Sequence, residues 1–425
     1  MTRKIRDERV RAARRGVRLA VAGAGLFALG AFAAGPAAAQ AARQEQAQGQ
    51  GQSARTAQFQ AFLRALEPRA RAAGVSKATF EAALDGLTPD PAAPSASAKQ
   101  PEFDKPLKTY LAEAAGAARV RRGRAAAERW RGELARVAGR TGVPPAIILA
   151  AWGLETDFGA VRGGKDVVRT LATLAFERPD RPLFVDEWIA ALAILEKEHA
   201  PREKLKGSWA GAMGDPQFIP SAYLKYAVSY DGQGYPDIWD KPQDSLASIG
   251  NFLRQSGWRP GQPWGLEVVL PPGFETPALR QTFEAFAAKG VTAADGTPIR
   301  ARGEATLFLP SGARGPAFLL SENYWILKAY NNSDSYALSL GLLADRIDGA
   351  GALRGRWPDD EVFLSRPQKA AIQTALQKRG FYKGTVDGRF GQASRDAIHA
   401  YQTANAIRPA DGFATPALLR RLTGD

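Results

Sequence analysis

The sequence predicts a mostly helical α+β protein that carries a small strand-bearing insertion and a separate helical unit at its C-terminal end. Apolar residues recur at helical spacing over most of the chain. Only residues 266–270 and 305–309 have the composition and spacing of strands. A connection rich in Gly, Arg and Pro at 349–358 precedes the last segment. The 425 residues exceed what one simple core holds, so two or more domains are expected.

The helices are predicted from the spacing of apolar side chains. Residues 59–87 repeat apolar positions three and four apart, and residues 110–139 form a basic, alanine-rich helical stretch. Residues 183–198 and 324–346 show the same spacing. Between the first two stretches, residues 88–101 are rich in Pro, Ala and Ser and are predicted to be a loop.

The changes in composition divide the chain into five segments. Residues 1–39 are expected to be a signal peptide, and residues 40–55, rich in Gln, Ala, Gly and Ser, a flexible linker. Residues 56–346 form the main domain, 347–362 a second linker, and 363–425 a compact C-terminal unit.

The N-terminal segment has the composition of a secretory leader. Four arginines precede an apolar run at 19–34, and small residues at 37–39 offer a cleavage site after Ala39. A membrane anchor is the alternative, but the run is short for a span and ends in a cleavage-like site. Without cysteine the mature chain is not a lipoprotein. We therefore expect a periplasmic protein; Arg14 and Arg15 leave the Sec and twin-arginine routes both open.

Composition excludes several kinds of chemistry. The absence of cysteine excludes disulfides, thiolate metal sites and a cysteine nucleophile. Because His199 and His399 are the only histidines, a histidine-based triad or a histidine-rich metal site is not expected either. Catalysis must therefore use carboxylates, amides and hydroxyls, and no cofactor is predicted.

The formal net charge of +14 favours an anionic partner. Nucleic acid is one such partner, but the basic residues are scattered and no nucleic-acid motif is present. A cell-wall polymer that bears carboxylates is the other, and we prefer it to nucleic acid.

Residues 150–159 contain one carboxylate, Glu155, in an otherwise apolar, aromatic-flanked helix. The helix is predicted to begin at Pro144 or Pro145 and to end at Gly159, which places Glu155 in or near its last turn. A helix C-terminus and an apolar environment both disfavour negative charge, so both raise the pKa of a carboxyl. A raised pKa is what a general acid needs. The alternative is a surface glutamate at a frayed helix end.

Two further segments carry groups that bind sugars. In 206–221, small residues let a ligand approach the backbone, Ser208 and Gln217 offer hydrogen bonds, and Phe218 offers a flat face to a sugar ring.

The second of these segments, 330–337, adds Tyr330, Asn331 and Tyr336, which supply hydroxyls and an amide. The alternative for each tyrosine is a half-buried core position.

The C-terminal unit is predicted to be a binding module. Residues 380–391 read Gly-Phe-Tyr-Lys-Gly-Thr-Val-Asp-Gly-Arg-Phe-Gly, and a later helix holds Tyr401 and Gln402. Glycines and Asp-Gly pairs mark tight turns between short helices. The unit has no pair of acids in a pocket-like arrangement, which argues against catalysis there.

Taken together, the motifs resemble lytic murein transglycosylases of the membrane-bound lytic transglycosylase B type (glycoside hydrolase family 103). The matching segments are Trp-Gly-x-Glu-Thr, Leu-Ala-Thr-Leu-Ala-Phe, Gly-Ala-Met-Gly-x-x-Gln-Phe-x-Pro-Ser and Tyr-Asn-x-Ser-x-x-Tyr-Ala, in this order. The resemblance covers roughly residues 56–346. The C-terminal unit resembles the three-helix peptidoglycan-binding domain.

The resemblance implies a lysozyme-like fold and cleavage of the β-1,4 bond between N-acetylmuramic acid and N-acetylglucosamine, with a 1,6-anhydro product. It implies that glycan strands are the partner; cell-wall synthesis or division proteins are further candidates. The catalytic position falls on Glu155, and the substrate-binding positions fall on Ser208, Gln217, Tyr330, Asn331, Tyr336 and Arg181. Two positions depart from the pattern: Asp180 replaces an arginine, and Phe252 replaces a tyrosine.

A single glutamate agrees with this chemistry. Hydrolysis by glycosidases ordinarily uses two carboxylates, whereas a hydroxyl of the substrate itself removes the need for a second one. Asp157 lies two residues from Glu155 and so points off its helix face. If Asp215 faced the scissile bond, hydrolysis by a muramidase would become possible. A non-catalytic wall-binding scaffold is the third hypothesis.

Some relatives are expected to carry a calcium loop, which would fall on residues 229–240. Acids stand at positions 3, 9 and 12 of this loop, and glycine at position 6, but position 1 is Ser229 and position 5 is Gln233. We therefore predict a loop without a metal ion.

Overall fold

The computed structural model describes residues 36–93 and 105–424. The chain divides into two compact units, Met1–Arg55 and Thr56–Asp425. The candidate site residues all lie in the second unit. The predicted leader lies mostly outside the described residues, so its cleavage near Ala39 stays a prediction.

The segment expected to be a flexible linker is helical. Residues 40–55 lie within α1 (Pro36–Arg64). This prediction was wrong because it gave weight to Gly49 and Gly51 and too little to the surrounding Ala, Gln, Glu and Arg, which are good helix formers.

Helices make up most of the main domain. The predicted stretch 110–139 is broken into three helices at Gly116 and Trp130. The predicted helix at 183–198 is confirmed as α11. The helices are α2 (Glu67–Ala72), α3 (Lys77–Leu84), α6 (Leu107–Ala114), α7 (Ala117–Arg129), α8 (Arg131–Thr141), α9 (Pro145–Thr156), α10 (Val167–Glu177), α11 (Leu183–Glu196), the 3-10 turn Arg202–Lys204, α12 (Pro220–Tyr226), α13 (Pro242–Gln255), α15 (Glu322–Asn331) and α16 (Asp334–Ile347).

Two hydrophobic cores fill this domain. The first gathers α9, α13, α15 and α16, and the second gathers the end of α1, α3, α10, α11 and α12. The rings of Phe252 and Tyr330 pack against both cores. These two side chains therefore mark the place where the cores meet.

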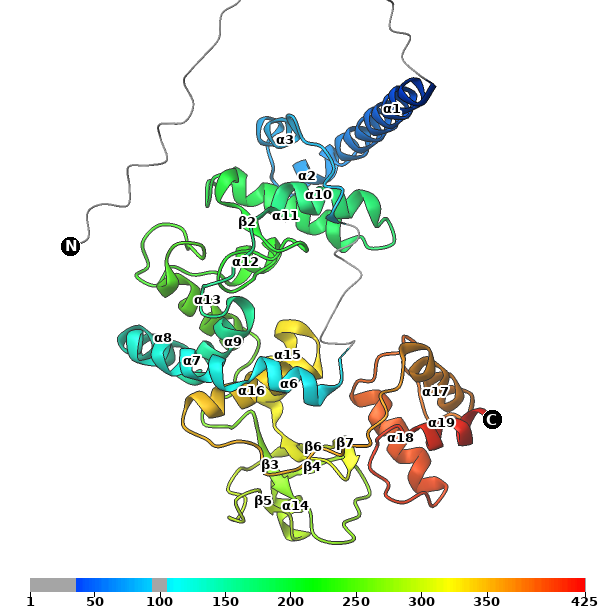
Figure 1. Ribbon diagram of the computed structural model, residues 1–425. Helices are drawn as coiled ribbons and strands as arrows, with labels where there is room; N and C mark the ends of the chain where they lie inside the picture. Colours follow the sequence, from blue (N-terminus) through cyan, green and yellow to red (C-terminus); the bar gives the residue numbers. More distant parts are fainter. Residues whose placement is uncertain (1–35, 94–104, 425) are drawn as a thin grey trace, which may run out of the picture. The chain divides into compact units, whose positions relative to one another are not determined.

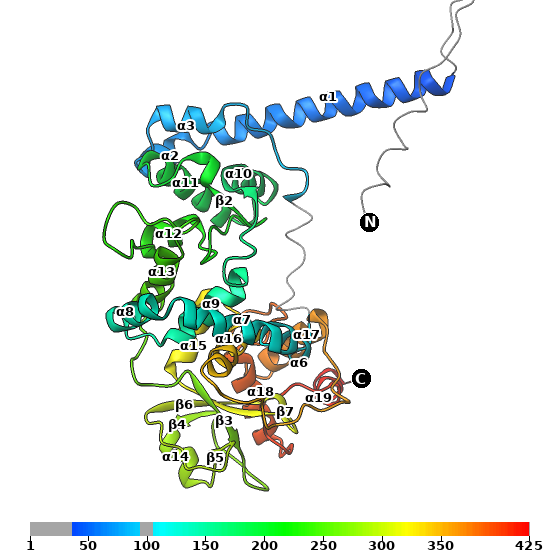
Figure 2. The same ribbon diagram turned by 60° about the vertical axis from the view of Figure 1, so that its left-hand side comes forward.

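The strand-bearing insertion is a five-stranded antiparallel sheet. Its strand order is β4-β6-β8-β3-β5, and α14 packs against it over a separate core that contains Phe283 and Phe286 (Figures 1 and 2). The strands predicted at 266–270 and 305–309 are confirmed as β3 and β6, each displaced by one residue. The bounds are β3 (Gly265–Val269), β4 (Arg280–Thr282), α14 (Phe283–Ala288), β5 (Thr292–Ala293), β6 (Glu304–Phe308), β7 (Pro310–Ala313) and β8 (Ala317–Leu320).

A second, two-stranded sheet pairs β1 (Lys165–Asp166) with β2 (Lys206–Gly207). Lys165 lies opposite Gly207 in this antiparallel pair. The pairing fixes the start of the glycine-rich segment 206–221 against the start of α10.

The C-terminal unit contains three helices around its own core. They are α17 (Arg366–Lys378), α18 (Gln392–Ala404) and α19 (Pro416–Thr423), and they gather together in Figure 1. A capping box of Ser365 and Gln368 begins α17. The buried amide of Gln373 holds the glycine-rich loop, since its oxygen accepts from the backbone N–H groups of Asp387 and Gly388.

The connection 348–365 has no helix or strand, but it is tied to the insertion. The Glu267 carboxylate accepts hydrogen bonds from the N–H groups of Arg354 and Gly355 at 2.9 and 2.7 Å. Further along, the Ser311 hydroxyl donates to Glu361 at 2.5 Å. The connection is therefore docked on the sheet.

No single helix among residues 36–93 and 105–424 is long and apolar enough to cross a membrane. Taken together, the helices α8 and α9 are long and apolar enough to span a membrane, but they are bent by 110° relative to each other. Most residues of α9 are buried in the first core.

One half-buried acid makes the stability of this fold depend on pH. The Asp345 carboxylate on α16 accepts a hydrogen bond from the indole N–H of Trp264 at 3.1 Å. Burial raises the pKa of Asp345 from 3.8 to about 6, against the effect of the Trp264 hydrogen bond, and the nearby Asp348 charge raises it further. A carboxyl with a raised pKa in the folded state contributes stability below its unfolded pKa and loses that contribution as pH rises through the folded pKa.

We predict that Asp345→Asn is more stable than the wild type above pH 6, by about 1–2 kcal/mol, because the amide keeps an acceptor for Trp264 without ionising. Below about pH 4 the advantage is expected to disappear, since both unfolded and folded carboxyls are then protonated. Urea unfolding of both proteins at pH 4, 6 and 8 measures the difference. A difference that does not change with pH would contradict the assignment.

Candidate active site

Glu155 lies in the last turn of α9, as predicted. The helix begins at Pro145 with Pro144 as its N-cap, and residues 147–153 are buried. It ends at Thr156 rather than at the predicted Gly159, because Asp157 already adopts the left-handed conformation with φ 51°. Asp tolerates this conformation better than most residues do. The Glu155 side chain is half-buried at this end.

A break between α15 and α16 brings two tyrosines together. The sequence predicted one helical stretch over 324–346, in which residues six apart would point in different directions. Instead Asn332 turns left-handed at φ 38°, and the hydroxyl of Ser333 caps α16 by accepting from the N–H of Tyr336. As a result the rings of Tyr330 and Tyr336 stack, with centroids 6.1 Å apart and 17° between their planes.

Tyr336 contacts Glu155 directly. Its hydroxyl donates a hydrogen bond of 2.6 Å to Oε1 of Glu155, and the tyrosine itself is only 3% exposed. Burial, and then the negative charge of Glu155, raise the pKa values of Tyr336 and Tyr330 well above 10. Both phenols therefore stay protonated and act as donors at neutral pH.

Tyr330 ties the glycine-rich segment to this cluster. Its hydroxyl donates to the carbonyl oxygen of Pro216 at 2.8 Å. The segment turns back on itself nearby, since Met213 and Phe218 exchange backbone hydrogen bonds of 2.8 and 3.1 Å. Gly214, with φ 62°, is needed in this turn because a Cβ there would lie 2.5 Å from the Ile238 carbonyl oxygen.

Two of the predicted polar residues shape the segment itself. The Gln217 amide donates to the carbonyl oxygens of Arg162 and Gly214 at 3.1 and 2.9 Å. The Ser208 hydroxyl accepts from the N–H groups of Ala210 and Ala212 at 3.3 and 3.2 Å. Both side chains are half-buried, so each has atoms on the surface of this turn as well.

The predicted role of Phe218 as a face for a sugar ring was wrong. Phe218 is 3% exposed and belongs to the second core. Its ring packs against Phe252 at 5.8 Å and Tyr330 at 6.1 Å. An apolar ring next to two others gains more from burial than from exposure, so Phe218 supports Tyr330 from behind.

The two remaining predicted residues, Asn331 and Arg181, differ in how near they stand to Tyr330 in the sequence. Asn331 is half-buried at the end of α15, directly after Tyr330. Arg181 is exposed on the turn between α10 and α11. In the described part of the chain, no hydrogen bond or ion pair joins its guanidinium to Glu155.

Both candidate second acids are paired with arginines. The Asp157 carboxylate lies 2.7 Å from Arg122 and 3.6 Å from Arg119. The Asp215 carboxylate, whose residue is 0% exposed, lies 2.5 Å from Arg162. Burial raises the pKa of Asp215, and the Arg162 charge opposes this rise.

Sequence reasoning missed these arginines. Arg162 and Arg122 lie 53 and 35 positions from their partners along the chain, so no local spacing marks them. Asp215 is fully buried beside Arg162, which argues against its facing the scissile bond as the hydrolytic hypothesis needs.

In the loop 229–240, the acids predicted as remnants of a calcium pattern have other partners. Asp237 and Asp240 lie 2.6 and 2.7 Å from the ammonium group of Lys204. The Asp231 carboxylate accepts from the hydroxyl of Ser229 and the N–H of Gln233. A lysine cation between two of these acids supports the prediction of a metal-free loop, which stays a prediction.

Comparison with known protein families shows the family to which the chain belongs. Residues 58–345 match the family described as Transglycosylase SLT domain, and residues 365–422 match the Putative peptidoglycan binding domain. The chain belongs to the SLT transglycosylase family. Its central domain has the fold of this family, with the small sheet as an insertion.

Individual relatives agree with the family. The chain is 34% identical over 213 residues to the membrane-bound lytic murein transglycosylase B of Escherichia coli K12. That alignment covers 48% of this chain and 57% of the relative, so the chain spans little more than half of its length.

Solved structures extend the likeness to nearly the whole chain. SltB3 of Pseudomonas aeruginosa, in complex with NAG-anhNAM-pentapeptide, superposes with a TM-score of 0.78 at 42% identity, covering 86% of this chain and 99% of that one. The Escherichia coli lytic transglycosylase Slt35, in complex with calcium, gives a TM-score of 0.58 at 27% identity, covering 68% of this chain and 92% of that one.

We predict that Arg162→Met destabilises the protein by about 2–3 kcal/mol, because it leaves the buried Asp215 carboxylate without a cation. Removing Arg162 raises the pKa of Asp215 further, so the loss is expected to be larger at pH 8 than at pH 5. The matched control is Arg122→Met, which breaks the more exposed pair with Asp157 and should cost less than about 1 kcal/mol. Urea unfolding measures both, and equal losses would contradict this description of Asp215.

Proposed function

We propose that this chain is a peptidoglycan lytic transglycosylase in which Glu155 serves as both general acid and general base. The observation that carries the proposal is the half-buried Glu155, which is held by Tyr336 while Asp157 and Asp215 are each paired with an arginine. Membership of the SLT family and the similarity to named lytic transglycosylases support the same activity.

The bond cleaved is the β-1,4 link between N-acetylmuramic acid and N-acetylglucosamine. Protonated Glu155 gives its proton to the leaving oxygen as the bond to C1 of the muramic acid breaks. The Glu155 carboxylate then takes the proton of the C6 hydroxyl of that same sugar, whose oxygen bonds to C1. The glutamate returns to its protonated form, and the product carries a 1,6-anhydro ring without entry of water.

An internal nucleophile explains why one carboxylate is enough. Attack by a hydroxyl of the same sugar ring has a large effective concentration, which lowers a barrier by up to ~7–11 kcal/mol in ideal cases. Hydrolysis would need a second carboxylate to activate water or to form a covalent intermediate. The burial of Asp215 beside Arg162 therefore favours the transglycosylase over the muramidase.

The residues around Glu155 divide into two groups in this proposal. Tyr336 orients the glutamate, and Tyr330 and Phe218 support Tyr336 and the glycine-rich turn. Four polar residues are proposed to bind the glycan: the half-buried Ser208, Gln217 and Asn331, and the exposed Arg181.

The cellular setting is also a proposal. The predicted leader and the composition without cysteine support an exported, periplasmic enzyme. Peptidoglycan strands are the proposed partner, supported by the C-terminal family match. Cell-wall synthesis and division proteins remain candidates as protein partners.

We predict that Glu155→Gln lowers turnover of purified sacculi by about 10³-fold or more, because the amide keeps the shape but cannot transfer the proton. Soluble muropeptides, separated by chromatography and weighed by mass spectrometry, give the rate. The matched control is Asp157→Asn, two residues away, where Asn suits the left-handed backbone; it should stay within about threefold of wild type.

Wild-type turnover by Glu155→Gln would refute the catalytic assignment. If the wild-type protein binds sacculi but releases no soluble product, the scaffold hypothesis is correct instead.

We predict that Tyr336→Phe lowers kcat roughly tenfold with little change in KM, since the lost hydrogen bond orients the Glu155 carboxyl group rather than the substrate. Tyr223→Phe is the control, because that buried hydroxyl donates to the Pro236 carbonyl oxygen and has no contact with Glu155. An unchanged kcat in Tyr336→Phe would show that this hydrogen bond has no part in the reaction.

A further inference from the structure

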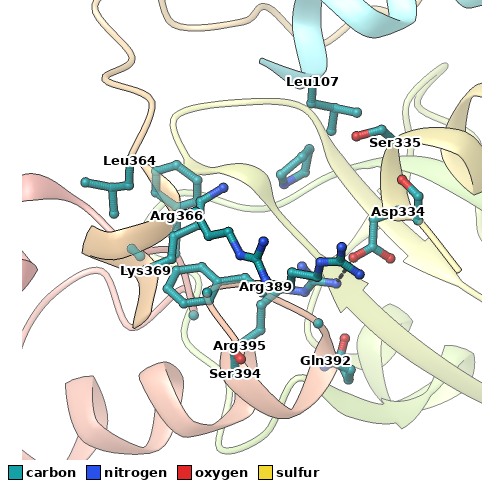
Figure 3. A pocket seen from close by; sticks show the side chains of 18 of the residues that line it. Leu107, Asp334, Ser335, Leu364, Arg366, Lys369, Arg389, Gln392, Ser394 and Arg395 are labelled. Carbon is teal, nitrogen blue, oxygen red and sulfur yellow. Dashed lines mark hydrogen bonds and ion pairs between the residues drawn. The ribbon is translucent and has the colours of Figure 1, made fainter. Parts of the chain in front are cut away.

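The C-terminal unit contacts the turn between α15 and α16, which sets the position of Tyr336. Asp334 is the first residue of α16, and Arg395 lies in the first turns of α18. Nη2 of Arg395 lies 2.6 Å from Oδ2 of Asp334, and both side chains line the same cleft. Figure 3 shows the guanidinium of Arg395 directed at the carboxylate of Asp334. An ion pair therefore joins the C-terminal unit to the main domain at this turn.

The two oxygens of Asp334 have partners from different parts of the chain. Oδ1 accepts from the ammonium of Lys328 at 2.8 Å and from the hydroxyl of Tyr324 at 2.9 Å. Both of these donors belong to α15. Oδ2 accepts from Arg395 at 2.6 Å. The helix α15 thus holds one oxygen, and the C-terminal unit holds the other.

The ion pair is largely shielded from water. The side chains of Asp334 and Arg395 are 15% and 13% exposed. The Arg395 guanidinium lies 4.6 Å from the centre of the Phe308 ring, which packs on Tyr324. Although burial opposes it, the charges of Arg395 and then Lys328 lower the pKa of Asp334 to about 2. Asp334 is therefore charged at neutral pH, and its attraction to Arg395 is screened less than that of a surface pair.

The local side-chain cap of α16 is weaker than this pair. The Ser333 hydroxyl accepts from the N–H of Tyr336 at 3.4 Å, which is longer than a usual N–H···O hydrogen bond. Asn332, the residue before it, has a left-handed backbone that costs energy for a side chain with a Cβ. The charged contacts of Asp334 are then the stronger side-chain contacts at the start of α16.

The position of this turn matters because Tyr336 lies two residues after Asp334. Its hydroxyl reaches Oε1 of Glu155 at 2.6 Å, a distance that a small movement of the helix start would lengthen. Misplacement of a group at a reacting centre by about 1 Å can lower a rate about 100-fold. A contact that holds the start of α16 therefore also acts on the orientation of Glu155.

We propose that Arg395 is a positioning residue for the reaction: from the C-terminal unit it holds Asp334, and through Asp334 it keeps Tyr336 within reach of Glu155. The inference rests on the proposed function for the reaction whose rate it affects. It gives the C-terminal unit a role in supporting the catalytic glutamate, separate from any contact of that unit with the polymer.

Other contacts dock the C-terminal unit at a second place. Arg408 forms an ion pair with Glu275, and Nε2 of His399 lies 3.1 Å from the carbonyl oxygen of Thr276. Both contacts are made with the segment before β4. Loss of Arg395 is therefore not expected to release the unit, and Arg408 offers a matched control: an arginine of the same unit, paired with another acid of the main domain.

The test compares Arg395→Met with Arg408→Met on short, soluble glycans without peptides. Methionine keeps an apolar contact with Phe308, and Asp334 keeps Lys328 as a cation, so the variant is expected to fold. We expect Arg395→Met to lower kcat about three- to fivefold with KM within about twofold, and Arg408→Met to stay within about 1.5-fold of wild type. Arg395→Lys, which restores the charge, should return kcat to within about twofold of wild type.

A double-mutant cycle tests whether Arg395 acts through Tyr336. When Tyr336→Phe is already present, adding Arg395→Met should lower kcat by less than about 1.5-fold, because the contact to be positioned is gone. The inference is overturned if Arg395→Met leaves kcat unchanged or if Arg408→Met lowers it equally. It is also overturned if the full loss persists in the Tyr336→Phe background.

Amide hydrogen exchange distinguishes failure of this inference from failure of the proposed function. The backbone of residues 332–337 should exchange about tenfold faster in Arg395→Met than in wild type, and at the wild-type rate in Arg408→Met. If the wild type cleaves no glycan, the proposed function fails, while the exchange rates still decide whether Arg395 holds the turn. Unchanged exchange in Arg395→Met would show that it does not.

Discussion

The hydrogen bond from Tyr336 to Glu155 is the interaction on which the candidate site depends. It exists because α15 and α16 are separate helices: Asn332 turns left-handed and Ser333 caps the second helix. The same turn stacks Tyr330 on Tyr336, and Tyr330 in turn holds the glycine-rich segment through the Pro216 carbonyl. One irregular pair of residues thus joins three segments that are far apart in the sequence.

The partners of the three carboxylates in this region indicate which reaction the site favours. Glu155 contacts a phenol that stays protonated, whereas Asp157 and Asp215 contact arginines. Both aspartates are therefore engaged by arginine side chains, and Asp215 is also fully buried. Of these three carboxyl groups, Glu155 is the one that we propose for proton transfer, and a reaction with an internal hydroxyl nucleophile is the one that needs no second carboxylate.

Local signals in the sequence were sufficient for several elements and for the position of Glu155 in its helix. Apolar spacing located α9, α11 and the strands β3 and β6 to within a few residues. What could not be predicted depends on contacts distant in sequence: the burial of Phe218 between Phe252 and Tyr330, and the arginine partners of the two aspartates. The break after α15 was missed because Asn and Ser are tolerated within helices as well as at their ends.

The central claim is that a sugar hydroxyl, and not water, attacks the bond that Glu155 opens. Digestion of purified sacculi in water enriched in oxygen-18, followed by mass spectrometry of the muropeptides, tests it directly. The account predicts muropeptides that end in 1,6-anhydro-muramic acid, lighter than their hydrolysed counterparts by one water and without the heavy isotope. Reducing ends that carry oxygen-18 would contradict it and would show that a second group activates water.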